Sequence, residues 1–257
     1  MQRLNAYDRR LEKLKQDLIK MGTTVQFRLE EAMAALILQD AERAKYIAES
    51  DDLVDDMDHA LESQTLWLML LQQPREEDLR VFSSTLRLTR ELERIGDYAV
   101  DIAEIALVLS DSGDYFKPLE DIGKMGQKAS SMLQDSLRAY VNSDLALATD
   151  VFRRDKMVDD LFNSLFDELM GYMKKEPRYV DQASYLSLVA RHLERIGDHA
   201  VNVAEMVCYL KTGERRFFRD LGRTSNLHPM ASCGEEKPEC CGSYQAEWNR
   251  VLPGEKR

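Results

Sequence analysis

The sequence predicts an all-α protein, a tandem repeat of two antiparallel three-helix bundles with six long helices. Apolar residues recur in steps of three and four over long stretches, which is the pattern of amphipathic helices. The segment ELERIGDYAVDIAE from Glu91 also returns as HLERIGDHAVNVAE from His192, with ten of fourteen positions identical at an offset of 101 residues. The chain therefore contains a second copy of its own motif, which indicates two similar halves.

The first helix is predicted over residues 4–36, where one apolar stripe runs without strand-like alternation. Further stripes predict helices over residues 41–71, 79–109, 119–141, 145–173 and 185–210. Turn-forming residues separate the stripes at Pro74, at the DSGDYFKP stretch from Asp111, at Asn142–Ser143 and at Pro177. Asp40 and Asp144 precede the middle helix of each half and are predicted N-caps.

The middle helices repeat as well. DDLVDDMDHAL from Asp51 matches DKMVDDLFNSL from Asp155 at an offset of 104, so the second half is three residues shorter between its second and third helices. Short connections make neighbouring helices antiparallel. We predict a first three-helix bundle over residues 1–112, a second over 113–212, and a tail over 213–257 that is mostly irregular because the apolar periodicity stops there.

Composition excludes several classes of protein. The net charge of −11 argues against an unassisted nucleic-acid binder and against a polybasic membrane anchor, and it favours cations or basic surfaces as partners. The longest apolar runs are far shorter than a membrane span, and the N-terminus has no apolar signal region, so we expect a cytoplasmic protein. Its four cysteines form no disulfide framework.

The repeated motif carries a stripe of carboxylates. On a helix, Glu93, Asp97, Asp101 and Glu104 fall inside an arc of about 80 degrees, opposite the apolar face. The second copy places Glu194, Asp198, Asn202 and Glu205 at the same four angles, with one amide oxygen in place of a carboxylate. Every position of the stripe therefore keeps an oxygen donor in both halves.

The middle helices add acidic residues of their own. In the first half Asp51, Asp55, Asp58 and Glu62 follow the same spacing, and Asp155 and Asp159 begin the spacing in the second. Phe162 is the equivalent of Asp58 in the second half, so the row of spaced acidic residues, here called the acidic ladder, is shorter there. Two such ladders on adjacent antiparallel helices would gather hard oxygen ligands suited to metal ions such as Ca²⁺, Mg²⁺, Mn²⁺ or Fe.

We predict one cation site in each half, with Zn as a further candidate metal. The candidate ligands are Glu93, Asp97, Asp101, Asp51, Asp55, Asp58, Glu194, Asp198, Asn202, Asp155 and Asp159. Arg94 and Arg195 either orient these carboxylates or bind an anion, with surface ion pairing as the simpler interpretation. Gly96 and Gly197 lie in mid-helix, where glycine costs about 1 kcal/mol relative to alanine. A crossing helix or a ligand must therefore approach the backbone closely there.

For any single helix, a solvated charged face is the simpler interpretation of an acidic stripe. Like charges four residues apart cost about 0.2–0.5 kcal/mol per pair, however, and this spacing is kept twice. The repetition favours a binding role.

The strings LERIGDYAV and LERIGDHAV, with VDD in each preceding helix, resemble the PhoU family of phosphate-transport and phosphate-signalling regulators. Two E-x-x-x-D motifs on tandem three-helix bundles, here Glu93 to Asp97 and Glu194 to Asp198, are the hallmark of that family. The resemblance covers about residues 5–213. It implies an all-helical cytoplasmic protein, often a homodimer, that binds multinuclear metal clusters through these motifs.

The resemblance also implies a function. Such regulators repress the phosphate-starvation response by contacting the phosphate ABC transporter and the sensor histidine kinase of a two-component system, so they meet the membrane only through their partners. This sequence departs from the family pattern at Asn202 and Phe162, which weaken the second cluster, and in the tail.

Three alternatives follow from the residues. A di-iron enzyme is disfavoured because no Glu-x-x-His pair occurs, and no other catalytic motif points to an enzyme. A metal-free helical scaffold could use the acidic ladders as docking faces for basic segments. In the tail, the four side chains that could bind Zn²⁺ lack a standard paired spacing; they are His228, Cys233, Cys240 and Cys241.

Overall fold

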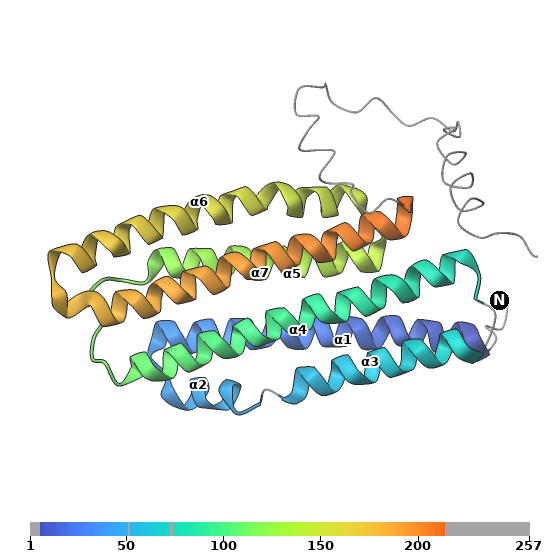
Figure 1. Ribbon diagram of the computed structural model, residues 1–257, viewed down its shortest axis with the longest axis horizontal. Coiled ribbons are helices and arrows are strands. Elements are labelled where there is room, and N and C mark those ends of the chain that lie inside the picture. The colour runs from blue at the N-terminus through green and yellow to red at the C-terminus, as the bar shows by residue number, and fades with distance from the viewer. Residues whose placement is uncertain (1–5, 51, 72–73, 214–257) are drawn as a thin grey trace, which may run out of the picture. The chain divides into compact units, whose positions relative to one another are not determined.

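The computed structural model describes residues 6–50, 52–71 and 74–213 (Figure 1). Over these ranges every regular element is helical, which confirms the predicted fold class. No helix there combines the length and the apolar character that crossing a membrane would require. The elements are α1 (Ala6–Leu38), α2 (Ala41–Ala48), α3 (Asp52–Leu71), α4 (Glu76–Ser110), α5 (Glu120–Asn142), α6 (Leu145–Lys175), η1 (Pro177–Tyr179) and α7 (Val180–Thr212).

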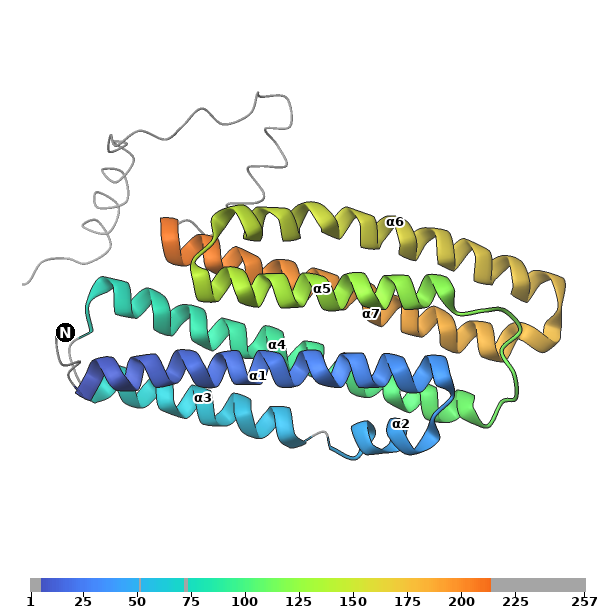
Figure 2. The ribbon, with the colours of Figure 1, turned by 180° about the vertical axis from the view of Figure 1, so that it is seen from behind.

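The helices form two groups that pack side by side. In the first group α1, α3 and α4 contact one another and α2 packs on α1 and α4, while α5, α6 and α7 form the second group. The groups meet along two antiparallel helix pairs, α4 with α7 (Figure 1) and α1 with α5 (Figure 2). Leucine, isoleucine, valine and alanine side chains of these helices fill the interior. The tail prediction, including its candidate zinc ligands, lies outside the described residues.

Equivalent residues make reciprocal contacts where α1 crosses α5. A Cβ atom on Gly22 would lie 2.6 Å from a methyl carbon of Leu137, and one on Gly126 would lie 2.7 Å from the terminal methyl of Met33. Gly22 and Gly126 are 104 residues apart, as are Met33 and Leu137. The two halves are therefore related by an approximate two-fold arrangement, with a glycine on each helix to permit close approach.

Both predicted N-caps are confirmed. The Asp40 carboxylate accepts a hydrogen bond from the backbone N–H of Arg43 at 3.0 Å. The Asp144 carboxylate accepts from the N–H groups of Ala146 and Leu147 at 2.9 and 3.0 Å. These bonds satisfy donors that the first turn of a helix leaves without partners.

The predicted helix over residues 41–71 is divided in the structure. α2 ends at Ala48 and α3 begins at Asp52. The buried Arg28 guanidinium donates to the Ile47 carbonyl at 3.1 Å, to the Ser50 hydroxyl at 2.7 Å and to the Ser50 carbonyl. Met132 occupies the equivalent position in the second half, 104 residues later, and α6 is continuous there. A tertiary contact that the periodicity does not contain thus ends α2.

Candidate functional site

Three carboxylates converge in the first half. Oxygens of Asp55 on α3 and of Glu93 and Asp97 on α4 lie within 4.8 Å of one another, and all three residues are half-buried. The Glu93 Oε2 atom is buried and has no hydrogen-bond partner among the described residues. A buried carboxylate oxygen without a donor is costly, and a cation placed among the three groups would relieve that cost.

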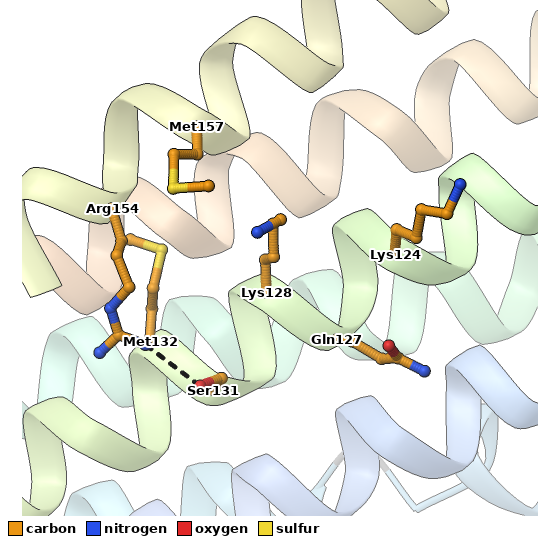
Figure 3. A pocket seen from close by; sticks show the side chains of 7 residues that line it. All are labelled: Lys124, Gln127, Lys128, Ser131, Met132, Arg154 and Met157. Atoms are coloured by element: carbon orange, nitrogen blue, oxygen red, sulfur yellow. Dashed lines mark hydrogen bonds between the residues drawn. The ribbon is translucent and has the colours of Figure 1, made fainter.

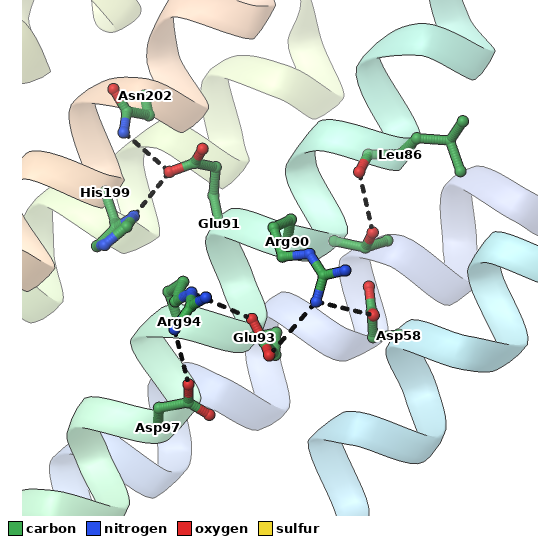
Figure 4. Close-up of polar contacts among 10 residues, drawn as sticks. Asp58, Leu86, Arg90, Glu91, Glu93, Arg94, Asp97, His199 and Asn202 are labelled. Atoms are coloured by element: carbon green, nitrogen blue, oxygen red, sulfur yellow. Dashed lines mark hydrogen bonds and ion pairs between the residues drawn. The ribbon is translucent and has the colours of Figure 1, made fainter.

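Two arginines flank this cluster (Figure 4). Arg94 lies 3.6 Å from Glu93 and 3.8 Å from Asp97, and Arg90 lies 3.5 Å from Glu93 and 3.9 Å from the buried Asp58. At these distances the pairs are electrostatic contacts rather than hydrogen bonds. Asp58, a predicted ligand, is therefore linked to the cluster by Arg90, whose guanidinium contacts both Asp58 and Glu93.

The second half gathers four carboxylates, Asp155 and Asp159 from α6 with Glu194 and Asp198 from α7. Burial, followed by the charges of the other three, raises the pKa of Asp155 to about 7. Burial also raises the pKa of Glu194, with Asp198 as the next cause, and that of Asp198, with Asp159 as the next cause. The Glu194 Oε2 atom is buried without a hydrogen-bond partner in the described chain, as is its counterpart in Glu93. The negative charge of this cluster is under-compensated, which suits a cation.

The mid-helix glycines have the neighbours that their position requires. A Cβ atom on Gly96 would lie 3.1 Å from Val54 of α3, and one on Gly197 would lie 3.3 Å from Asp155 and 3.5 Å from Val158 of α6. The crossing helix, as predicted, is what approaches the backbone. Gly197 also leaves room for the Asp155 carboxylate inside the second cluster.

Lowering the pH from 7 to 4 is expected to stabilise the metal-free protein through Asp155. Its pKa is about 7 in the folded state against an ordinary value of 3.8, so the folded protein holds a proton that the unfolded chain releases. The stabilisation is therefore complete below about pH 4 and is lost as the pH rises through about 7. Because Asp155 is only half-buried, we expect an effect of about 1 kcal/mol.

Urea denaturation across this pH range, with chelator present, measures the effect in the wild type and in Asp155→Asn. The variant should lack this part of the pH dependence. Identical pH profiles for the two proteins would refute the assignment.

The acidic stripe predicted for α4 and α7 is divided between two neighbours. The Asn202 amide donates to Glu91 Oε2 at 2.8 Å, and His199 Nδ1 lies 2.7 Å from the same oxygen (Figure 4). Asp101 lies 3.6 Å from His192 across the same helix pair. The acidic side chains spread over an arc of about 80 degrees around their helix. Those at one edge of the arc face α3 or α6 of the same half, and those at the other edge face the opposite half. Asp101 and Asn202, both predicted metal ligands, therefore contact the opposite half and lie apart from the carboxylate clusters. Asp51, another predicted ligand, lies outside the described residues.

Sequence reasoning overlooked Arg90 and Arg191, which are also 101 residues apart. Arg191 lies 3.2 Å from Glu194, as Arg90 pairs with Glu93, and its guanidinium lies 5.5 Å from the Phe162 ring centroid. Phe162 replaces Asp58 in the repeat, so a cation–π contact replaces an ion pair. The shared offset was a signal that could have identified both arginines.

Arg195, predicted to lie near the second cluster, has its guanidinium 5.7 Å from the Tyr98 ring centroid on α4. Arg195 therefore also contributes to the contact between the halves.

A family model described as the PhoU domain matches the chain twice, over residues 18–106 and 122–207. The chain belongs to the PhoU family. Each matched segment contains one E-x-x-x-D motif and the acidic part of its preceding helix, so both carboxylate clusters lie in the PhoU repeats. The family resemblance read from the sequence is thereby confirmed.

Relatives of this PhoU-family protein match over most of their own length. The phosphate-specific transport system accessory protein PhoU homolog of Clostridium acetobutylicum is 38% identical over 80% of this chain and 94% of its own. The homolog of the same name in Caulobacter vibrioides is 34% identical over 82% and 92% of the two chains.

Solved PhoU structures share the fold. The crystal structure of PhoU from Pseudomonas aeruginosa superposes with a TM-score of 0.79 at 33% identity, covering 81% of this chain and 100% of that one. The phosphate transport system regulatory protein PhoU from Streptococcus pneumoniae gives a TM-score of 0.75 at 29% identity, covering 81% and 98%. Similarity at this level extends through both bundles of the PhoU repeat.

Proposed function

We propose that this protein is a cytoplasmic regulator of phosphate uptake and phosphate signalling that is not an enzyme and acts as a homodimer. It represses the phosphate-starvation response by contacting the phosphate ABC transporter and a sensor histidine kinase. Relatives named as accessory proteins of the phosphate-specific transport system support the link to the transporter. The observation that supports regulation through metal binding is the convergence of three carboxylates in the first half, together with one buried glutamate oxygen without a hydrogen-bond partner in each half of the described chain. In the second half the support is the mutual effect of four carboxylates on their pKa values.

In this proposal each half binds cations. Asp55, Glu93 and Asp97 would hold the first site, and the second would use Asp155, Asp159, Glu194 and Asp198. Carboxylate oxygens without imidazole or thiolate suit hard ions, with Fe, Mn, Mg and Ca ahead of Zn. A bound cation would link α3 to α4 and α6 to α7, and would thereby stiffen the surfaces that a partner meets.

A metal-free scaffold is the second candidate function, and the arginines favour it. Arg90 and Arg94 already face the first cluster at 3.5–3.8 Å and supply part of the positive charge that a metal would supply. In that case the acidic surfaces would bind basic segments of partners directly.

Chelation tests the metal-binding role. Protein purified from phosphate-replete cells is expected to contain metal by elemental analysis, and removal with chelator should lower its melting temperature by several degrees, because a ligand that binds only the folded state stabilises it. Restoring the metal should reverse the shift. Protein without metal, and with a melting temperature insensitive to chelator, would support the scaffold.

Repression is tested in cells that lack the protein. A reporter of the phosphate-starvation response should remain active in high phosphate, and the wild-type gene should switch it off. Failure of the wild-type gene to restore repression would refute the regulatory function itself.

A further inference from the structure

A groove of about 420 Å³ lies between α1 and α5, where the two halves meet. Leu29, Met33 and Ile37 line one side, and Gly123 and Gly126 line the other. A Cβ atom on Gly123 would meet one atom within 4 Å, the Ile37 terminal methyl at 3.5 Å. The glycine therefore leaves open space beside a half-exposed isoleucine.

A basic pocket of about 260 Å³ between α5 and α6 adjoins this groove and shares Gln127 and Ser131 with it (Figure 3). Lys124, Lys128 and Arg154 line the pocket, and no carboxylate is among its lining residues in the described chain. Glu30 also lines the groove, and its carboxylate accepts hydrogen bonds from Ser130 at 2.8 Å and from Gln26 at 2.9 Å. The groove and the pocket together offer an apolar floor, with lysines along the edge that faces α6.

The three basic side chains of this pocket differ in the ion pairs that they make. Arg154 binds Asp135 at 2.7 Å and Asp150 at 3.0 Å, and Lys124 binds Asp121 at 3.1 Å. No carboxylate of the described residues lies within ion-pair distance of the Lys128 ammonium, which points into the space between α5 and α6 (Figure 3). In a protein of net charge −11, an uncompensated cation beside an apolar groove marks a surface for an acidic ligand.

We propose that the groove between α1 and α5 binds an amphipathic helix of the phosphate ABC transporter that carries carboxylates along one edge of its apolar face. This rests on the proposed function, which supplies the transporter as partner. An apolar groove between two helices accepts a third helix through residues spaced three and four apart. The ligand's carboxylates would meet Lys128 and Lys124.

Two other occupants fit less well. A second copy bound through the same groove would bring Lys124 and Lys128 toward their own counterparts, since a symmetric contact pairs a surface with itself. A flat anionic lipid surface would not fill a concave groove, and its charge would repel a protein of net charge −11. The groove also lies on α1 and α5, whereas the carboxylate clusters lie on α3, α4, α6 and α7 (Figures 1 and 2), so a partner and a metal would not compete.

The test measures binding of the detergent-solubilised transporter to the immobilised full chain. Gly123→Leu fills the groove and replaces glycine with a better helix former, so the fold should be kept. Gly171→Leu is its matched control, because a Cβ atom at that α6 position meets nothing within 4 Å. Lys124→Glu with Lys128→Glu reverses the cationic edge, and Lys174→Glu with Lys175→Glu is the charge-matched control.

Both groove variants are expected to raise the Kd at least tenfold, with both controls within twofold of the wild type and all melting temperatures preserved. A helical Leu/Glu peptide should compete with the transporter, and its Leu/Lys counterpart should not. Transporter binding unaffected by the groove variants would overturn the docking surface and leave the proposed function standing. No transporter binding by the wild type would refute the transporter contact as well.

Two further results would overturn the proposal. Vesicles of anionic lipid that bind the wild type and lose binding with Gly123→Leu would assign the groove to the membrane. A change from dimer to monomer in Gly123→Leu, measured by sedimentation, would assign it to a second copy.

Discussion

Replacing Glu93 with Gln and Asp97 with Asn is expected to empty the proposed metal site of the first half. Changing only the partners of metal ligands costs about 10–100-fold in affinity, so changing two ligands should cost ~100-fold or more. The two substitutions keep shape and remove two of the three negative charges that converge there. Hard cations depend on anionic oxygens, and only Asp55 would remain among the described ligands. Metal titration followed by calorimetry measures the loss, and elemental analysis should show that only the second site stays loaded.

Glu104→Gln is the matched control for this variant, because Glu104 is an exposed acid of the same helix and lies outside the convergent set. It should bind metal as the wild type does. If the double variant kept full metal content, the first cluster would be an ion-pair network with Arg90 and Arg94. If the variant lost its metal but still repressed the phosphate-starvation response, the metal would be structural.

Replacing Arg28 with Met is expected to lower the free energy of unfolding by about 3 kcal/mol. Arg28 is buried, and its guanidinium donates to three acceptors at the end of α2. Methionine is the residue that the second half carries at the equivalent position, so it fits the packing of the repeat but donates no hydrogen bonds. The buried Ile47 carbonyl and the half-buried Ser50 carbonyl would lose a charged donor.

Arg43→Met on α2 is the control, because its ion pairs with Glu31 and Asp40 are longer and partly exposed, at 3.5 and 3.6 Å. It should cost less than about 1 kcal/mol. Urea denaturation compares the two variants, and hydrogen exchange should show faster opening at the α2–α3 junction in Arg28→Met. Equal stabilities for both variants would mean that Arg28 does not hold the end of α2.

Much of the fold could be predicted because helical information is local. The steps of three and four place apolar side chains on one face, and the duplication indicates a repeated bundle before any contact is known. Asp40 and Asp144 were identifiable as caps because capping depends on residues within one turn. The break between α2 and α3 was not predictable, because it depends on Arg28, about twenty residues earlier in the chain.

For the candidate site, too, local features could be predicted from the sequence and contacts between helices could not. The sequence by itself determined which residues carry oxygen, their spacing on α4 and α7, and their duplication at an offset of 101 residues. The tertiary structure decided which of them meet: Glu93 and Asp97 turn to α3, whereas Asp101 turns to His192 of the other half. A helical projection gives each side chain an angle but no neighbour, and neighbours are set by how whole helices pack. That is why the acidic stripe was visible in the sequence and its division between a carboxylate cluster and an interface was not.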